Sequence, residues 1–185
     1  MKNKLLYETK HLSLYETEKG FVYAQRRTID SSATLCFKKE LNEYKFLIRF
    51  QPLPEVKEKT SWNHCYPCPI TGSIEKNETP IENAIKEVFE EGGIKIDSTN
   101  IVKSFYAVAT TQMNEKNFYF LADVSNLKEQ KPINDGSIFE KASFNKWLSY
   151  KELKDILNNE LTLSSLYICL NMFKEYLYEN HNITI

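Results

Sequence analysis

The chain has 185 residues, which is enough for one domain with a sizeable core. Its 24 Lys and Arg residues nearly balance its 25 Asp and Glu residues, so no global basic field points to nucleic acid or to an anionic membrane. The first residues lack the apolar core of a signal peptide, and no run of about 18 apolar residues predicts a membrane span. We therefore expect a cytoplasmic protein that binds neither nucleic acid nor a membrane.

Short segments in the first part of the chain have the composition of β-strands. Residues 12–15 and 21–26 are predicted to be strands, and residues 32–37 and 44–50 are predicted to pair as a hairpin. The next stretch, residues 51–62, contains two prolines and mixed charges and is predicted to be a loop. Because a lone hairpin is only marginally stable in water, the N-terminal strands are expected to need a covering surface.

A helix with well-marked ends is predicted after a tight loop that begins at Gly72. Thr79 suits the N-cap, Pro80 suits the first helical position, and Glu82 completes a capping box. The helix is expected to stop at Gly92-Gly93, because glycine commonly follows the last helical residue. Its apolar stripe, which would face the core, consists of Ile81, Ala84, Ile85 and Val88.

Three carboxylates, Glu87, Glu90 and Glu91, share one face of this predicted helix at spacings of three and four. They lie in the last turn, where the helix dipole disfavours each anion by about 0.3–1 kcal/mol. A bound divalent cation would remove this penalty, because Mg²⁺ takes carboxylate oxygens as ligands. Replacing Glu91 by Gln is accordingly expected to cut any activity of this site by orders of magnitude with little effect on the fold, and to preserve or even raise the stability of the metal-free protein.

The second half of the chain predicts two strands, residues 101–109 and 117–124, followed by a polar loop over residues 126–136. Residues 139–148 also have strand-like composition. Two helices are predicted to close the chain, residues 150–158 and 161–178, and the second has apolar residues at the helical period. A mixed sheet between helices, an α/β layered domain, is the fold class that follows.

The segment that begins at Gly72 resembles the Nudix box. Its fixed positions are matched in register by Gly72, Glu78, Glu87, Val88, Glu90, Glu91, Gly93 and Ile94. The one departure is Lys86, which stands where the family has an arginine. Lysine keeps the charge but not the forked hydrogen-bonding geometry.

The resemblance extends at lower specificity to the ADP-ribose pyrophosphatase branch of the Nudix hydrolases. It implies an α/β/α sandwich over residues 31–185 and a small N-terminal β region, residues 1–30, that contributes to a homodimer. The implied activity is hydrolysis of ADP-ribose or another nucleoside diphosphate sugar. A dinucleotide polyphosphate or nucleoside triphosphate pyrophosphohydrolase, and a non-catalytic Nudix-like ligand-binding protein, remain open as alternatives.

The resemblance also implies roles for individual residues. Mg²⁺, or Mn²⁺ in its place, would be held by Glu87, Glu90, Glu91 and the backbone carbonyl of Thr71. The candidates for the general base are Asp135, Glu140 or a box glutamate such as Glu90 or Glu91. Three arginines are candidates for binding phosphate, because the guanidinium group binds phosphate in a forked geometry: Arg26, Arg27 and Arg49. Gly72, Glu78, Lys86 and Gly93 are expected to shape and brace the box.

Overall fold

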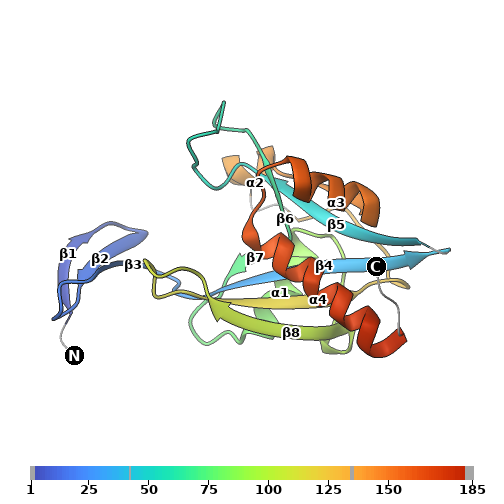
Figure 1. Ribbon diagram of the computed structural model, residues 1–185, viewed down its shortest axis with the longest axis horizontal. Helices are drawn as coiled ribbons and strands as arrows, with labels where there is room; N and C mark the ends of the chain where they lie inside the picture. The colour runs from blue at the N-terminus through green and yellow to red at the C-terminus, as the bar shows by residue number, and fades with distance from the viewer. Residues whose placement is uncertain (1–2, 42, 134–135, 182–185) are drawn as a thin grey trace.

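The computed structural model of the chain describes residues 3–41, 43–133 and 136–181. A seven-stranded mixed sheet forms its centre, and a separate three-stranded sheet lies to one side at the N-terminal end (Figure 1). The predicted α/β fold class with a mixed sheet is confirmed. None of the helices in the described part of the chain is long and apolar enough to cross a membrane.

The N-terminal sheet consists of β1 (Lys4–Glu8), β2 (Leu12–Glu16) and β3 (Val22–Arg26), paired antiparallel in that order. The second and third strands lie where the sequence predicts them. The first was missed, because its apolar residues are consecutive and do not alternate with polar ones. All five residues of β1 are exposed, so this sheet leaves apolar side chains uncovered.

The main sheet is built around the predicted hairpin of β4 (Ser31–Glu40) and β5 (Glu43–Gln51). Its strand order is β10-β5-β4-β9-β8, in which β4 and β9 run parallel and the other neighbours antiparallel. The remaining strands are β6 (Tyr66–Cys68), β7 (Ile70–Ser73), β8 (Ile101–Val108), β9 (Lys116–Asp123) and β10 (Phe144–Ser149). Because β7 pairs with the first residues of β4 and leads toward the box helix, the box loop starts at the centre of the sheet.

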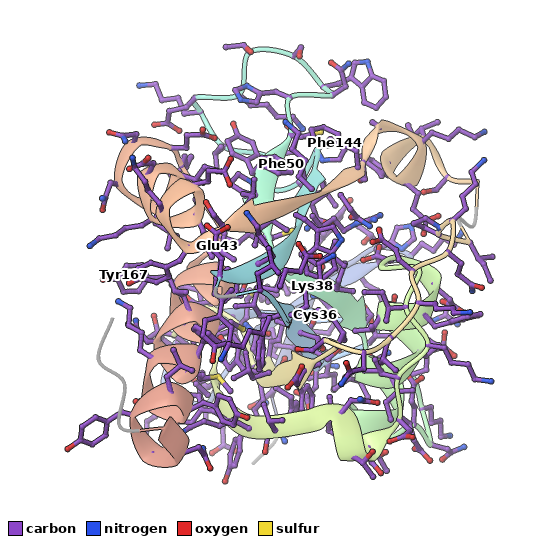
Figure 2. All side chains as sticks on the ribbon, turned by 90° about the vertical axis from the view of Figure 1, so that its right-hand side faces the viewer. Cys36, Lys38, Glu43, Phe50, Phe144 and Tyr167 are labelled. Atoms are coloured by element: carbon purple, nitrogen blue, oxygen red, sulfur yellow. The ribbon has the colours of Figure 1, made fainter. Side chains whose placement is uncertain are left out.

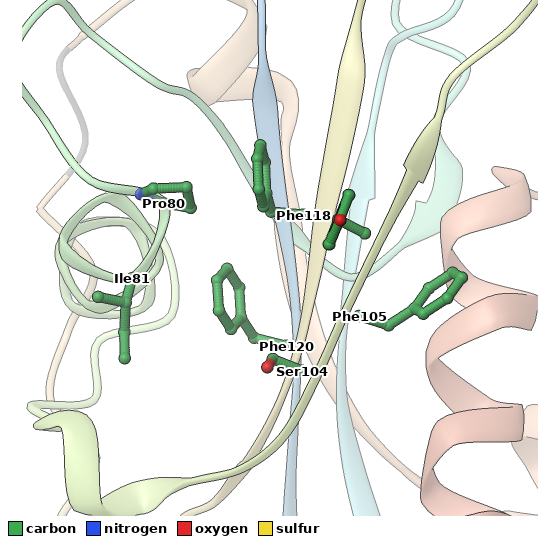
Figure 3. Close-up of a pocket in the computed structure, with 7 residues that line it drawn as sticks. Pro80, Ile81, Ser104, Phe105, Phe118 and Phe120 are labelled. Carbon is green, nitrogen blue, oxygen red and sulfur yellow. The ribbon is translucent and has the colours of Figure 1, made fainter.

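Helices cover the two faces of this sheet. Helix α1 (Pro80–Glu90) packs on one face, over a cluster that includes Leu47 and Val88. On the other face, α3 (Tyr150–Asn159) and α4 (Ser164–His181) cover a larger cluster centred on Phe37, Phe46 and Phe173. The close-up in Figure 3 shows α1 and α4 on opposite sides of the strands. This arrangement is the layered sandwich that the sequence resemblance implies.

The segment before β10 corrects one prediction. Residues 139–148 were expected to be a strand, but the first part forms the short helix α2 (Ile138–Ala142), and only Phe144–Ser149 is a strand. The hydroxyl group of Ser137 accepts a hydrogen bond from the Glu140 N–H and caps this helix. The strand then brings Phe144 against Phe50 of β5, with ring centroids 5.0 Å apart (Figure 2). The prediction missed the helix because a capped turn of five residues is too short to show a helical period.

Candidate active site

The box helix has the boundaries that its sequence predicts. The Thr79 hydroxyl accepts a hydrogen bond from the Glu82 N–H, and the Glu82 carboxylate accepts one from the Thr79 N–H, so the capping box is formed. At the other end Gly93 adopts a φ of 70°, and a Cβ there would lie 2.1 Å from the Gln130 carbonyl oxygen. Gly93 is therefore needed where the helix ends against the loop that follows β9.

A second glycine allows the box loop to contact the helix. A Cβ built on Gly72 would lie 2.3 Å from Cγ of Glu87, so any other residue would push this carboxylate aside. Because Gly72 has no side chain, Glu87 can lie against the backbone of β7. The requirement for glycine here comes from close approach rather than from a positive φ.

Lys86 and Glu78 brace the loop that joins β7 to α1. The Lys86 Nζ atom lies 3.1 Å from Oε1 of Glu78 and 3.9 Å from Oε1 of Glu87. The other oxygen of Glu78 accepts hydrogen bonds from the Glu75 N–H and from the buried amide of Asn83. Asn83 also donates to the Ser73 carbonyl, and it accepts a hydrogen bond from Ser32. Lys86 therefore keeps the ionic contact expected of the family's arginine.

Glu91 is held between the box loop and β5. Its Oε1 atom lies 3.0 Å from Nη2 of Arg49, which is only 2% exposed, while its Oε2 atom is buried without a hydrogen-bond partner among the described residues. Burial raises the pKa of Glu91 to about 7, although the positive charge of Arg49 and a backbone hydrogen bond with Thr71 oppose this shift. The Glu91 carboxylate therefore joins the C-terminal end of the box helix to Thr71, at the start of the box loop.

Glu87 has a similar electrostatic environment. Burial raises its pKa to about 7, with Lys86 opposing and the negative charge of Glu90 adding to the shift. The negative charge of Glu140 on α2 also raises the pKa of both Glu87 and Glu91. Of the two candidate bases from the late part of the chain, Glu140 thus acts electrostatically on this site, whereas Asp135 lies outside the described residues.

The donor chemistry of the site fits a hard divalent cation. All its side-chain donors are carboxylate oxygens, one of them is buried without a partner among the described residues, and burial disfavours the negative charge that a cation would neutralise. Within the described ranges, no group of three or more His, Cys, Asp or Glu side chains is arranged to hold a metal ion. The site thus supplies suitable ligands, whose side chains would have to converge when a cation binds.

A pocket of about 390 Å³ lies against the box loop. Thr71, Gly72 and Ser73 form one of its walls, and the other wall residues include Arg26, Glu115 and Ser165. Its volume lies in the usual range of roughly 300–1,000 Å³ for ligand pockets. Gly72 lines this pocket and also lies against Glu87, although none of the box carboxylates is among the described residues that line it.

The structure separates the three arginines that the sequence groups as phosphate ligands. Arg26 lines the box pocket and bonds to Glu115, Ser31 and Ser73. Arg27 is exposed and lines a neighbouring hollow with Lys76. Arg49 is buried and bound to Glu91. These three arginines therefore do not form one phosphate-binding cluster in this structure.

A different hollow, of about 770 Å³, lies between α1 and the strands β8 and β9 (Figure 3). Pro80 and Ile81 face Phe118 and Phe120 across it. The described residues that line it are uncharged. It offers nothing to neutralise a diphosphate, so the smaller pocket beside the box is the better candidate for the active site.

Comparisons with known proteins identify the family of the chain. A family model for the NUDIX domain matches residues 42–166. The chain belongs to the NUDIX family. Curated protein sequences give no match. The fold of this Nudix protein resembles the crystal structure of an ADP compounds hydrolase, with a TM-score of 0.62 and 15% sequence identity over 99% of this chain and 95% of that chain.

Family membership confirms the prediction of a Nudix pyrophosphohydrolase, and Nudix enzymes generally use divalent metal ions. The roles of individual residues remain predictions. Sequence reasoning missed three residues of the site: Asn83, Glu115 and Ser165. Asn83 lies in the box helix and is fully buried, but nothing in the sequence marks its amide as a brace. Glu115 and Ser165 come from distant segments that only the fold brings to the pocket.

Proposed function

We propose that this Nudix protein hydrolyses a diphosphate bond in a nucleoside diphosphate sugar, with ADP-ribose as the first candidate and Mg²⁺, or Mn²⁺ in its place, as the cofactor. The observation that carries the proposal is the contact of Gly72 with both the pocket and Glu87. This contact would place a diphosphate in the pocket next to buried carboxylates that lack a full set of counter-charges. A nucleotide-type substrate is also what the family implies.

Each residue of the site has a proposed role. Glu87, Glu90, Glu91 and the Thr71 carbonyl would hold the cation, which when bound would neutralise the diphosphate and acidify a water molecule. Glu140 on α2, whose charge acts on Glu87 and Glu91, accepts the proton of the attacking water. Arg26 lines the opposite wall as an ion pair with Glu115, and Gly72 keeps Glu87 close to the box loop.

Two alternatives differ in their substrate chemistry. A dinucleotide polyphosphate or nucleoside triphosphate would bring extra negative charge into a pocket whose Arg26 is already paired with Glu115. A non-catalytic ligand-binding protein would not need the complete set of box carboxylates. Both observations favour the nucleoside diphosphate sugar.

The proposal is tested with a panel of substrates in Mg²⁺ and in Mn²⁺, scored by released AMP or UMP. The panel contains ADP-ribose, UDP-glucose, a diadenosine polyphosphate and ATP. We expect the highest kcat/KM with ADP-ribose or UDP-glucose, and no turnover in the presence of chelator. Preference for ATP or the diadenosine compound would favour the first alternative, and binding of ADP-ribose without turnover would favour the second.

We further propose that residues 1–30 form a dimerisation region and that residues 31–185 form the catalytic domain. The N-terminal sheet exposes apolar side chains, among them Leu5 (46% exposed), Leu6 (43%) and Tyr7 (63%), and a small sheet of this kind needs a covering surface. A second copy of the chain, related by a two-fold axis, would supply that surface. The NUDIX match begins at residue 42 and so leaves this sheet outside the catalytic family domain.

Light scattering at micromolar concentration tests the dimer. We expect a dimer for the parent and a shift toward monomer for Leu6→Glu, which places a charge on the exposed face of β1. Leu41→Glu is the matched control, because Leu41 is 98% exposed in the turn between β4 and β5. A monomeric parent would refute this part of the proposal without affecting the proposed chemistry.

A further inference from the structure

The pocket beside the box contains a buried hydroxyl group that no contact within the described fold explains. Ser165, in the first turn of α4, is 7% exposed, and its Oγ atom has no hydrogen-bond partner among the described residues. It lines the pocket together with the box loop. A buried polar group without a partner costs free energy, so a hydroxyl kept at such a place indicates a partner that binds from the pocket.

The charges in the same pocket are already matched. Nη1 of Arg26 lies 3.0 Å from Oε1 of Glu115, which is 7% exposed, and Ser31 donates a hydrogen bond to the same oxygen. Nη2 of Arg26 donates to the Ser73 hydroxyl. Among the described residues that line the pocket, Arg26 and Glu115 are the charged ones. The part of the pocket wall that contains Arg26 and Glu115 therefore offers hydrogen bonds to a ligand without a net charge.

An unpartnered hydroxyl group beside paired charges favours a neutral polar ligand over a further phosphate group. A further phosphate would have to lose its hydration beside the buried carboxylate of Glu115, which is unfavourable without a free cation. Sugar hydroxyls both donate and accept hydrogen bonds, as do the serine hydroxyls of this wall. We infer that the pocket binds a sugar ring of the substrate, and that Ser165 and Glu115 determine specificity by bonding to its hydroxyl groups.

This inference rests on the proposed function, because it assigns residues to the sugar of the same substrate. The test compares the steady-state kinetics of ADP-ribose hydrolysis by the parent protein and by Ser165→Ala. Loss of one neutral hydrogen bond should raise KM about three- to tenfold, with kcat retained. The melting temperature of the metal-free variant should stay unchanged or rise, because a buried group without a partner has been removed.

Thr34→Val is the matched control. Thr34 is fully buried in β4, and its Oγ1 atom likewise has no partner in the described part of the chain, but it is not among the described residues that line the box pocket. We expect this variant to keep the melting temperature or raise it, and to keep the parent KM. A rise of KM in Ser165→Ala but not in Thr34→Val separates ligand binding from a general effect of removing a buried hydroxyl.

Product inhibition then identifies which sugar occupies the pocket. Hydrolysis of ADP-ribose by water gives AMP and ribose 5-phosphate, and each product carries one of the two ribose rings. Weaker inhibition of Ser165→Ala by ribose 5-phosphate alone would place the terminal sugar there, and weaker inhibition by AMP alone would place the nucleoside ribose there. Either result supports sugar binding at this wall.

Glu115→Gln provides a second measurement, because it keeps the size of the side chain but removes its charge. We expect a higher KM for ADP-ribose and stronger inhibition by inorganic phosphate, since Arg26 then loses its counter-charge. Unchanged KM values for ADP-ribose in both Ser165→Ala and Glu115→Gln would overturn the inference. A parent protein that hydrolyses no sugar-linked diphosphate would instead refute the proposed function itself.

Discussion

The two walls of the candidate active site are built in different ways. The first, which we call the local wall, comes from one continuous segment, the strand, loop and helix that run from Ile70 to Gly93. The opposite wall combines Arg26 of the N-terminal sheet, Ser31 of β4, Glu115 before β9 and Ser165 of α4. Residues of one continuous segment keep their positions relative to one another, whereas the shape of a wall built from distant segments changes when any of these segments changes. We infer that the reaction type is set by the first wall and the substrate preference by the second.

The largest effect is expected from Glu87→Gln, which removes one carboxylate charge from the local wall at constant size. Turnover should fall by two orders of magnitude or more, because a proposed cation ligand is lost. The fold should be retained, since the partner Lys86 keeps its closer contact with Glu78. Steady-state kinetics under limiting Mg²⁺ checks this result. Glu82→Gln is the control, because glutamine also completes a capping box, and this variant should keep the parent kcat.

Glu91→Gln is expected to lose activity to a similar extent, but also to lose stability. Arg49 is almost fully buried, and its guanidinium would be left without its counter-charge. Breaking such a buried pair costs about 3–5 kcal/mol. Chemical denaturation of the metal-free variant measures this loss. A stability equal to that of the parent would show that the pair contributes little to the fold.

Gly72→Ala should reduce kcat by about 100-fold, because the new Cβ would displace Glu87 by a distance of the order that perturbs catalytic geometry. Gly20→Ala serves as the contrast. Gly20 has a φ of 79° and nothing within 4 Å of an added Cβ, so its substitution introduces backbone strain far from the box. We expect a lower melting temperature and an unchanged kcat for Gly20→Ala. An unchanged kcat in Gly72→Ala would contradict the role of close approach in the local wall.

Lys86→Met should lower kcat by about tenfold, because Glu78 would lose the ion pair that braces the loop. Lys86→Arg should match or exceed the parent, since arginine restores the forked hydrogen bonds found in the family. The two variants are compared under saturating Mg²⁺ and substrate. Equal rates for Met, Lys and Arg at this position would show that the brace has no catalytic effect.

The smallest expected effect is the pH dependence of stability without metal. Burial raises the pKa of Glu87, which is not paired with Arg49, from 4.5 to about 7, so the folded protein holds a proton there that the unfolded chain releases in this range. Stability should therefore fall as pH rises from 4.5 to 7 and then level off. Each kcal/mol lost corresponds to about 2–4 °C in melting temperature for a protein of this size. Thermal melts in chelator measure the decline, which should be smaller in Glu87→Gln.

The sequence alone was sufficient for the ends of the helix in the local wall, but not for the buried amide of Asn83 within it. Thr79, Glu82 and Gly93 mark the ends of the helix by their own hydrogen-bonding and backbone requirements, and the structure has them in these roles. The expectation that Glu91→Gln preserves stability is revised, because the burial of Arg49 against Glu91 depends on the packing of β5. The helix around Glu140 was missed because it is one short capped turn. Glu115 and Ser165 could not be found, since their significance depends on burial and on neighbours far away in the chain.

We propose that the box carboxylates form a cation site that supports hydrolysis in the neighbouring pocket. Calorimetric titration of Mg²⁺ and Mn²⁺ into the substrate-free protein tests it most directly. We expect saturable binding by the parent and by Glu82→Gln, with binding by Glu87→Gln weakened at least tenfold, or about 1.4 kcal/mol. Absence of binding by the parent, or equal affinity in Glu87→Gln, would contradict it.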